Sequence, residues 1–194
     1  ASKKTNPFTT TMFHELFHVY SRLQPKKSDQ LYQLIGFEEL GYSSLRIPRA
    51  LSERVLHNPD GVDFAQKITL KQANSTVIQA IPVLYANQPG YQPGNNEFFG
   101  YVEFNLFQIE KNSDGSWRVL TKDDGFTSTL SLDKQPDFFN QIKDNTGYII
   151  HPDEVLADNF SFVMSRKKSP ALTVRFSEAG KKLLDDIEKI LKEK

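Results

Sequence analysis

The chain has 194 residues and equal numbers of basic and acidic side chains, 24 of each, so its formal net charge is zero. It lacks the basic excess that nucleic-acid phosphates require, and a mean hydropathy of −0.49 without long apolar runs excludes a membrane-spanning helix. The absence of cysteine excludes disulfides and thiolate ligands, so a metal site would need histidine and carboxylate ligands. The length is typical of one domain with its own core.

Residues 6–57 are predicted to be helical. The first helix is expected to end before Pro25, because proline removes a helix hydrogen bond and restricts the residue before it. Ser28 is expected to cap a second helix, which Gly36 closes in the left-handed conformation typical of a helix end. A short third helix is expected at residues 48–55.

Residues 62–132 have a different pattern, which is typical of strands. The runs that carry it are rich in β-branched and aromatic residues and lie at 68–70, 76–81, 83–85, 98–110 and 117–120. Turn-forming residues at 112–115 connect the last two runs as a hairpin. We therefore expect an antiparallel sheet in this region.

Helical patterns return in the last part of the chain. The expected helices cover residues 137–143, a segment beginning at His151, and residues from Ser177 to the C-terminus. The predicted fold class is α+β. It consists of one domain over residues 1–194, with helical regions at 6–57 and 136–194 and an inserted antiparallel sheet at about 62–132.

The segment from His14 to His18 reads H-E-x-x-H. Residues four apart share one face of a helix, so both imidazoles can bind one ion, and neutral imidazole suits Zn²⁺. In this motif the carboxylate after the first ligand lies beside the metal-bound water and acts as general base. We expect a zinc ion with His14 and His18 as ligands and Glu15 as the catalytic base. The competing interpretation is a pair of histidines that only make core hydrogen bonds.

A catalytic zinc normally has three protein ligands and an open position for water. Glu154 and Asp158 are four residues apart in the last predicted helical region, which gives E-x-x-x-D on one helix face. Glu154 is the predicted third ligand, and Asp158 is predicted to orient a ligand histidine. His151 and Asp158 are the competing ligands, and an ordinary pair of surface acids is the alternative interpretation.

These two motifs resemble the gluzincin branch of the zinc metallopeptidases, the thermolysin-like group. The resemblance implies a zincin-like region in which an active-site helix and a glutamate helix hold Zn²⁺ for water-mediated peptide hydrolysis. Carried over by position, His14 and His18 match two ligands, Glu15 the general base, Glu154 the third ligand and Asp158 the acid behind a ligand. The resemblance covers the two motif segments, which the β-rich region separates here.

Hydrolysis through an oxyanion requires a hydrogen-bond donor beside the metal, and gluzincins use tyrosine or histidine for this. Tyr148 and His151 shortly precede Glu154 and are the candidates for this catalytic role, with His57 as a third. The alternative interpretations are a core aromatic for Tyr148, a helix cap for His151 and a turn residue for His57.

The sequence therefore predicts a zinc-dependent metallopeptidase that acts on a peptide or protein substrate. Two rival hypotheses are a non-catalytic zincin-like module, in which the metal serves structure or binding, and a metallohydrolase of a cell-wall amide. No signal peptide is recognisable. We expect an extracytoplasmic or secreted protein whose signal has been removed, and one hypothesis is that the chain is the C-terminal part of a longer protein.

Overall fold

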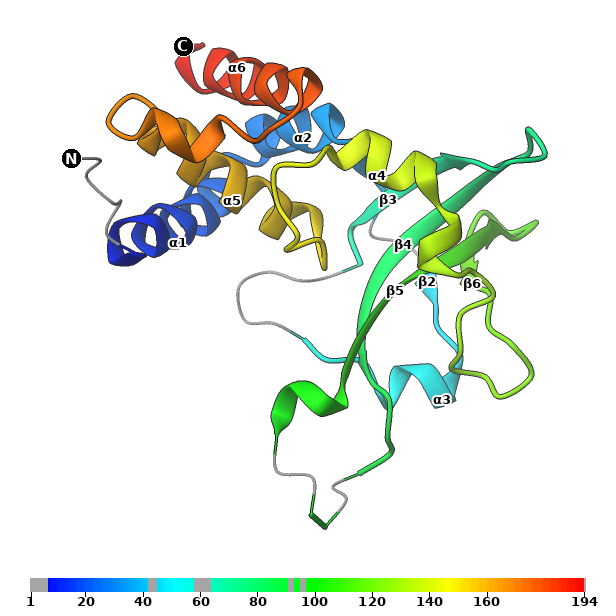
Figure 1. Ribbon diagram of the computed structural model, residues 1–194. Helices are drawn as coiled ribbons and strands as arrows, with labels where there is room; N and C mark the ends of the chain where they lie inside the picture. Colours follow the sequence, from blue (N-terminus) through cyan, green and yellow to red (C-terminus); the bar gives the residue numbers. More distant parts are fainter. Residues whose placement is uncertain (1–6, 42–44, 58–63, 91–92, 95–96, 194) are drawn as a thin grey trace. The chain divides into compact units, whose positions relative to one another are not determined.

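The structure, a computed structural model, describes residues 7–41, 45–57, 64–90, 93–94 and 97–193. Within these residues it contains six α-helices and a six-stranded sheet, so the architecture is mixed α and β (Figure 1). The chain forms two compact units. Unit one combines residues 1–38 with 138–194, and unit two comprises residues 39–137. Among the described residues, none of the helices is both long and apolar enough to cross a membrane.

The helices of unit one come from both ends of the chain. They are α1 (Pro7–Leu23), α2 (Pro25–Leu34), α4 (Pro136–Ile142, which begins in unit two), α5 (Pro152–Ser165) and α6 (Glu178–Lys192). A short 3-10 turn, Pro170–Thr173, precedes α6. The helices α1 and α5 lie side by side (Figure 1), and the ring of buried Phe17 packs against that of Phe160 with centroids 5.6 Å apart. This contact between distant segments brings the two sequence motifs together.

The start of α2 differs from the prediction. The helix begins at Pro25 rather than after Ser28, because proline fits the first helical position, where no N–H bond is lost. The hydroxyl of Ser28 instead donates to the carbonyl of Ser21 at 3.0 Å, inside the buried junction of α1 and α2. Gly36 follows the helix as predicted, with φ of +83°, and a Cβ there would lie 1.9 Å from Oε1 of Gln141.

The two last helices begin with side-chain caps. The Nδ1 atom of His151 accepts a hydrogen bond from the backbone N–H of Asp153, and Pro152 occupies the first turn of α5. The hydroxyl of Ser177 accepts from the N–H of Gly180 at the start of α6. Capping satisfies N–H groups that have no partner within the helix, which fixes where each helix begins.

The sheet has the strand order β1-β3-β4-β5-β6-β2. Its strands are β1 (Phe37–Glu39, where the chain passes into unit two), β2 (Leu45–Arg46), β3 (Gln66–Lys71), β4 (Val77–Ala86), β5 (Val102–Lys111) and β6 (Trp117–Val119). The short helix α3 (Arg49–Ser52) lies between β2 and β3, and the 3-10 turn Phe98–Tyr101 lies between β4 and β5. A further 3-10 turn, Leu132–Lys134, lies between β6 and α4.

Three features of the sheet differ from the prediction. Residues 37–39 and 45–46 form two short strands rather than helix, and β2 pairs parallel to β6, with Leu45 opposite Trp117. The two runs predicted around Pro82 form one strand, β4, because the pairs between β3 and β4 end at Ala80 and leave the proline beyond them. The predicted strand at 98–110 begins only after a 3-10 turn.

One cluster of buried apolar side chains forms the core of unit two. Its members come from α3, from the central strands and from the segment after β1, and they are Leu40, Leu51, Ile81, Val83, Tyr85, Phe107, Ile109 and Val119. Alternation along β4 and β5 places five of them on one face of the sheet, namely Ile81, Val83, Tyr85, Phe107 and Ile109. The long antiparallel pair of β4 and β5 therefore contributes most of the core of this unit.

Candidate metal centre

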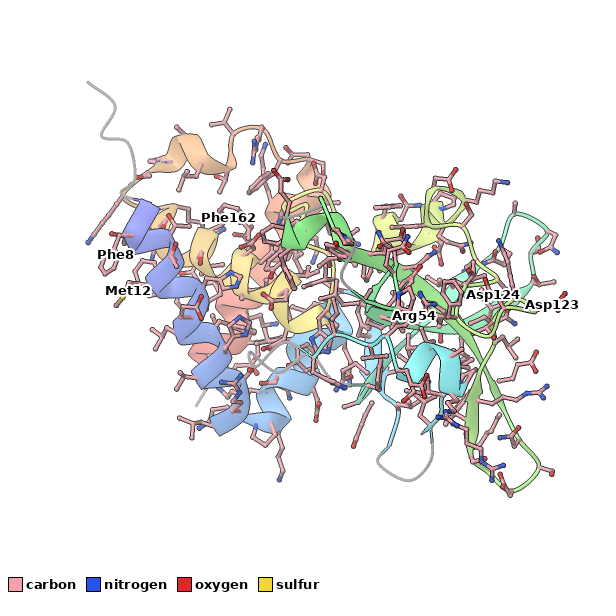
Figure 2. All side chains as sticks on the ribbon, turned by 90° about the horizontal axis from the view of Figure 1, so that it is seen from below. Phe8, Met12, Arg54, Asp123, Asp124 and Phe162 are labelled. Atoms are coloured by element: carbon pink, nitrogen blue, oxygen red, sulfur yellow. The ribbon has the colours of Figure 1, made fainter. Side chains whose placement is uncertain are left out.

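The helix α1 has two chemically different faces. His14 and His18 lie one turn apart toward α5, with His18 almost fully buried at 2% exposure and ring centroids 4.9 Å apart. The opposite side carries exposed apolar residues, among them Phe8 and Met12, which Figure 2 shows on the outer side of the helix. The four-residue spacing of the motif therefore directs both imidazoles into unit one.

Glu154 on α5 faces both imidazoles with one carboxylate oxygen. Its Oε2 atom lies 3.0 Å from Nε2 of His14 and 3.5 Å from Nε2 of His18. The Glu154 side chain is 1% exposed, so its charge is removed from water and must be compensated within the unit. These three side chains offer ligand atoms that all lie within 4.8 Å of one another, and the group could hold a metal ion.

The Nδ1 atom of each histidine is hydrogen-bonded to an aspartate of α5, a different one for each ring. Nδ1 of His14 lies 3.0 Å from Oδ1 of Asp158, and Nδ1 of His18 lies 2.6 Å from Oδ2 of Asp153. The hydroxyl of Thr146 donates to Asp158 in turn. Hydrogen bonding at Nδ1 fixes the orientation of an imidazole and leaves Nε2 to face a ligand or a metal.

Asp153 is itself held by two hydroxyl groups. The phenol of Tyr32 donates to its Oδ1 at 2.7 Å, and the hydroxyl of Ser21 donates to its Oδ2 at 3.2 Å. Tyr32 comes from α2 and Ser21 from α1, so three helices contribute to the position of His18. The prediction from sequence did not include Asp153 or Tyr32. The only available signal was a second acid directly before Glu154.

The electrostatics of the centre favour positive charge. Burial lowers the pKa of His14, but its hydrogen bonds to Asp158 and Glu154 outweigh burial and raise that pKa to about 9. Burial likewise lowers the pKa of His18, but its hydrogen bond to Asp153 and the nearby charge of Glu154 outweigh burial and raise that pKa to about 10. Burial raises the pKa of Glu154, but the two histidines lower it to about 2. Without a metal, both imidazoles are therefore protonated near pH 7, and their positive charges compensate the neighbouring carboxylates.

The residues present fit a bound divalent cation. Nε2 of His18 is buried and makes no hydrogen bond within the described part of the chain, because its distance of 3.5 Å from Glu154 is too long for one. A buried ring nitrogen without a partner reduces the stability of the fold, unless a metal binds its lone pair or an acceptor bonds to its N–H. Two imidazoles and a carboxylate, each imidazole backed by an acid, form a donor set typical of catalytic zinc sites.

The three remaining site candidates in unit one occupy different surroundings. Glu15 follows His14 on α1 and is exposed to solvent. The ring of Tyr148 stacks on that of His14, with centroids 5.9 Å apart and planes at 29°, and Tyr148 is 41% exposed. His151 is buried at 3% and caps α5 through Nδ1. The structure thus places Tyr148 against a candidate ligand, whereas His151 has the capping role that was its alternative interpretation.

Two other residues that the sequence analysis considered, His57 and Asp158, are not members of the candidate ligand group. His57 belongs to unit two, where its ring contacts that of Phe64 with centroids 6.3 Å apart. Asp158, the competing third ligand, bonds to the nitrogen of His14 that faces away from Glu154. In comparisons with known proteins, no family model, curated protein or solved structure matches this chain.

Proposed function

We propose that this protein is a zinc-dependent peptidase with a zincin-like centre of the gluzincin type. One observation carries the proposal: Nε2 atoms of two histidines one helical turn apart face a single oxygen of Glu154, while both Nδ1 atoms are bonded to aspartates. His14, His18 and Glu154 would hold the ion, and Asp158 and Asp153 would orient the two imidazoles. Zinc held in such a set lowers the pKa of water and polarises a carbonyl group.

The residues of the chain supply the proton transfers in this proposal. Glu15 follows a ligand on α1, is exposed and is not part of the ligand group, so its carboxylate is free to accept a proton from the attacking water. It would then deliver that proton to the leaving amine. Tyr148, stacked on His14, would donate its phenol hydrogen to the oxyanion as charge develops there.

Zinc is favoured over other metals by the arrangement around the ligands. Two histidines and one carboxylate also suit non-haem iron. A carboxylate that adjoins the ligand set without belonging to it suits metal-assisted hydrolysis, in which a general base acts beside the ion. Metal analysis of the purified protein distinguishes these cases. About one zinc per chain is expected, and iron in its place would contradict the proposal.

Cleavage of an unstructured protein tests the reaction. Zinc-loaded protein is incubated with casein in the presence of 1,10-phenanthroline, which chelates zinc, or of 1,7-phenanthroline, which does not. We expect cleavage with the second compound and none with the first. Zinc binding without cleavage of casein, or of any peptide, would instead support the metal-binding module. Release of peptides from peptidoglycan, but not from casein, would support hydrolysis of a cell-wall amide.

A further inference from the structure

Unit two contains a cavity of about 430 Å³ at the end of β4, and none of the candidate metal ligands lines it. Three segments form its wall: the residues that follow α3, the residues around the end of β4, and the 3-10 turn before β5. The wall is mainly apolar, with contributions from Val55, Leu56, Ala86, Pro89, Phe98 and Tyr101. A volume of this size is within the range of pockets that bind small organic groups, about 300–1,000 Å³.

Backbone hydrogen bonds hold two of these segments against the end of β4. The N–H of Ala86, the last residue of β4, donates to the carbonyl of Arg54 at 2.8 Å. The N–H of Asn87, the next residue, donates to the carbonyl of Tyr101 at 2.9 Å. Both sides of the cavity are therefore attached to the same strand end. A cavity with fixed walls loses little conformational entropy when a ligand binds.

Two charged residues line the cavity, Glu53 and Arg54. Oε1 of Glu53 lies 2.7 Å from Nε of Arg49, so the charge of Glu53 is compensated by an arginine outside the cavity. The guanidinium group of Arg54 stacks on Phe126, with Cζ 3.9 Å from the ring centroid, and its Nη1 donates to the carbonyl of Asn87 at 3.2 Å. These contacts fix the position of the group, but within the described residues Arg54 makes no ion pair.

Two acids on the turn that carries Phe126, Asp123 and Asp124, do not compensate the charge of Arg54 (Figure 2). Oδ1 of Asp124 accepts hydrogen bonds from the N–H groups of Phe126 and Thr127, at 3.0 and 2.8 Å, and its Oδ2 accepts from the hydroxyl of Thr127. This carboxylate is therefore satisfied within its own turn. In the part of the chain that the structure describes, neither acid forms an ion pair with Arg54. The charge of Arg54 is thus available to a ligand.

We propose that this cavity binds an organic anion in which a carboxylate is attached to an aromatic or branched apolar group. The carboxylate pairs with Arg54, whose planar guanidinium carries five N–H donors and uses one of them on the carbonyl of Asn87. The apolar group covers Phe98, which is 65% exposed in the cavity wall. A free organic acid and the C-terminal residue of a peptide share this chemistry. The inference goes beyond the proposed peptidase function, because the cavity belongs to unit two.

Titration of the ¹⁵N-labelled protein, followed by NMR, measures both the affinity and the location of binding. The probes are 3-phenylpropionate, its neutral analogue 3-phenylpropionamide, and propionate, which carries the charge without the ring. We expect 3-phenylpropionate to bind at least about tenfold more tightly than either, since a hydrogen bond to a charged group contributes about this much. The backbone signals of Leu56, Ala86 and Tyr101 should shift. Equal affinities for the acid and the amide would overturn the inference.

Substitution of Arg54 tests the charged half of the site. Arg54→Gln removes the charge, so the acid and the amide should bind this variant equally weakly. Arg118→Gln is the matched control, because Arg118 also belongs to unit two but pairs with Glu110 at 2.8 Å and does not line the cavity. This control should prefer the acid as wild type does. A preference for the acid that persists in Arg54→Gln would overturn the inference.

Phe98→Ala tests the apolar half, and it decides the question if Arg54→Gln does not fold. Because Phe98 is largely exposed, its loss should leave the Tm unchanged while the affinity for 3-phenylpropionate falls toward that for propionate. An unchanged affinity would overturn the inference.

A further probe, N-acetylphenylalanine, resembles the last residue of a peptide and distinguishes the two sources of the ligand. Tighter binding of this probe than of 3-phenylpropionate would support a peptide C-terminus, and weaker binding a free organic acid. Zinc binding by Arg54→Gln and Phe98→Ala should equal that of wild type, because the candidate ligands belong to unit one. The cavity and the peptidase function can therefore fail separately.

Discussion

Oδ2 of Asp153 lies 2.6 Å from Nδ1 of His18, and both side chains are nearly inaccessible to solvent. This contact determines which nitrogen of His18 faces Glu154. The carboxylate is in turn fixed by Tyr32 and Ser21, so the orientation of one imidazole depends on three helices. His14 has the equivalent contact with Asp158, which is more exposed at 28%.

The first prediction concerns these two supporting aspartates. Replacing Asp153 by Asn is expected to weaken zinc binding by about 10–100-fold, the usual cost of losing an acid behind a ligand histidine. The corresponding Asp158→Asn change should cost less, because water screens the charge of the more exposed residue. Competition with a fluorescent chelator measures both affinities. Asp123→Asn, an exposed residue of unit two, is the control and should bind zinc like wild type.

The second prediction distinguishes a ligand from a supporting residue. Glu154→Ala removes a proposed ligand and should abolish stoichiometric zinc binding, whereas Asp158→Ala should only weaken it. Elemental analysis after dialysis against a defined concentration of free zinc gives the occupancy of each variant. Loss of zinc from Asp158→Ala together with retention by Glu154→Ala would reverse the ligand assignment. Loss of zinc from His151→Ala at an unchanged Tm would contradict the gluzincin resemblance, because an unchanged Tm excludes an effect through the lost cap of α5.

The local parts of this centre could be predicted because a helix has a fixed period. The spacing of His14 and His18, and that of Glu154 and Asp158, places each pair on one face whatever the rest of the chain does. The partner of His18 could not be predicted in the same way. Asp153 reaches it only through the packing of α5 against α1, which depends on contacts such as Phe17 with Phe160.

The fold shows the same division between local and long-range information. The strands β4 and β5 are long and rich in β-branched and aromatic residues, so their sequence pattern indicates them directly. The strands β1 and β2 span three and two residues, which is too short for a detectable alternation. β2 exists because Leu45 and Arg46 meet β6 in the folded unit, and the sequence near these residues does not encode that pairing.

The third prediction concerns an ion-pair cluster between α5 and α6. Glu188 on α6 bonds to Lys192 at 2.6 Å and to Arg166 at the end of α5. The bond from Lys192, followed by that from Arg166, lowers the pKa of Glu188 from 4.5 to about 2. A carboxyl group with a lowered folded-state pKa stabilises the fold above its unfolded pKa, and this stability is lost as the pH falls.

Glu188→Gln should therefore reduce the free energy of unfolding by about 1 kcal/mol or less at pH 7, as partly exposed ion pairs do. The difference from wild type should shrink as the pH falls from 4.5 toward 2 and vanish near its lower end. Urea denaturation is the suitable measurement, because guanidinium salt would screen the pairs. Glu178→Gln changes a residue that is 91% exposed and pairs with Lys181 across one turn of α6, so this variant should differ little from wild type at any pH.

The fourth prediction concerns removal of the metal. Zinc that binds the folded protein stabilises it by about 2.7 kcal/mol when its free concentration is one hundred times Kd. Chelation should therefore lower the Tm and increase hydrogen exchange in α1 and α5, which carry the ligands. The strands β4 and β5 of unit two supply the internal reference and should exchange at an unchanged rate. Equal changes in both units would mean that zinc acts on the whole chain rather than at this centre.

The last prediction separates the peptidase from a metal-binding module and concerns Glu15. Glu15→Gln preserves the size of the side chain but removes the base, and Glu15 is exposed and lies outside the ligand group. Zinc content and Tm should therefore remain at the wild-type level. The rate of peptide hydrolysis should fall by at least about 10²-fold, the lower end of what a positioned acid or base contributes. Glu15→Asp, which retains a carboxylate on a shorter side chain, should keep part of the activity. If Glu15→Gln cleaves casein as fast as wild type, another group accepts the proton, and the role assigned to Glu15 is wrong.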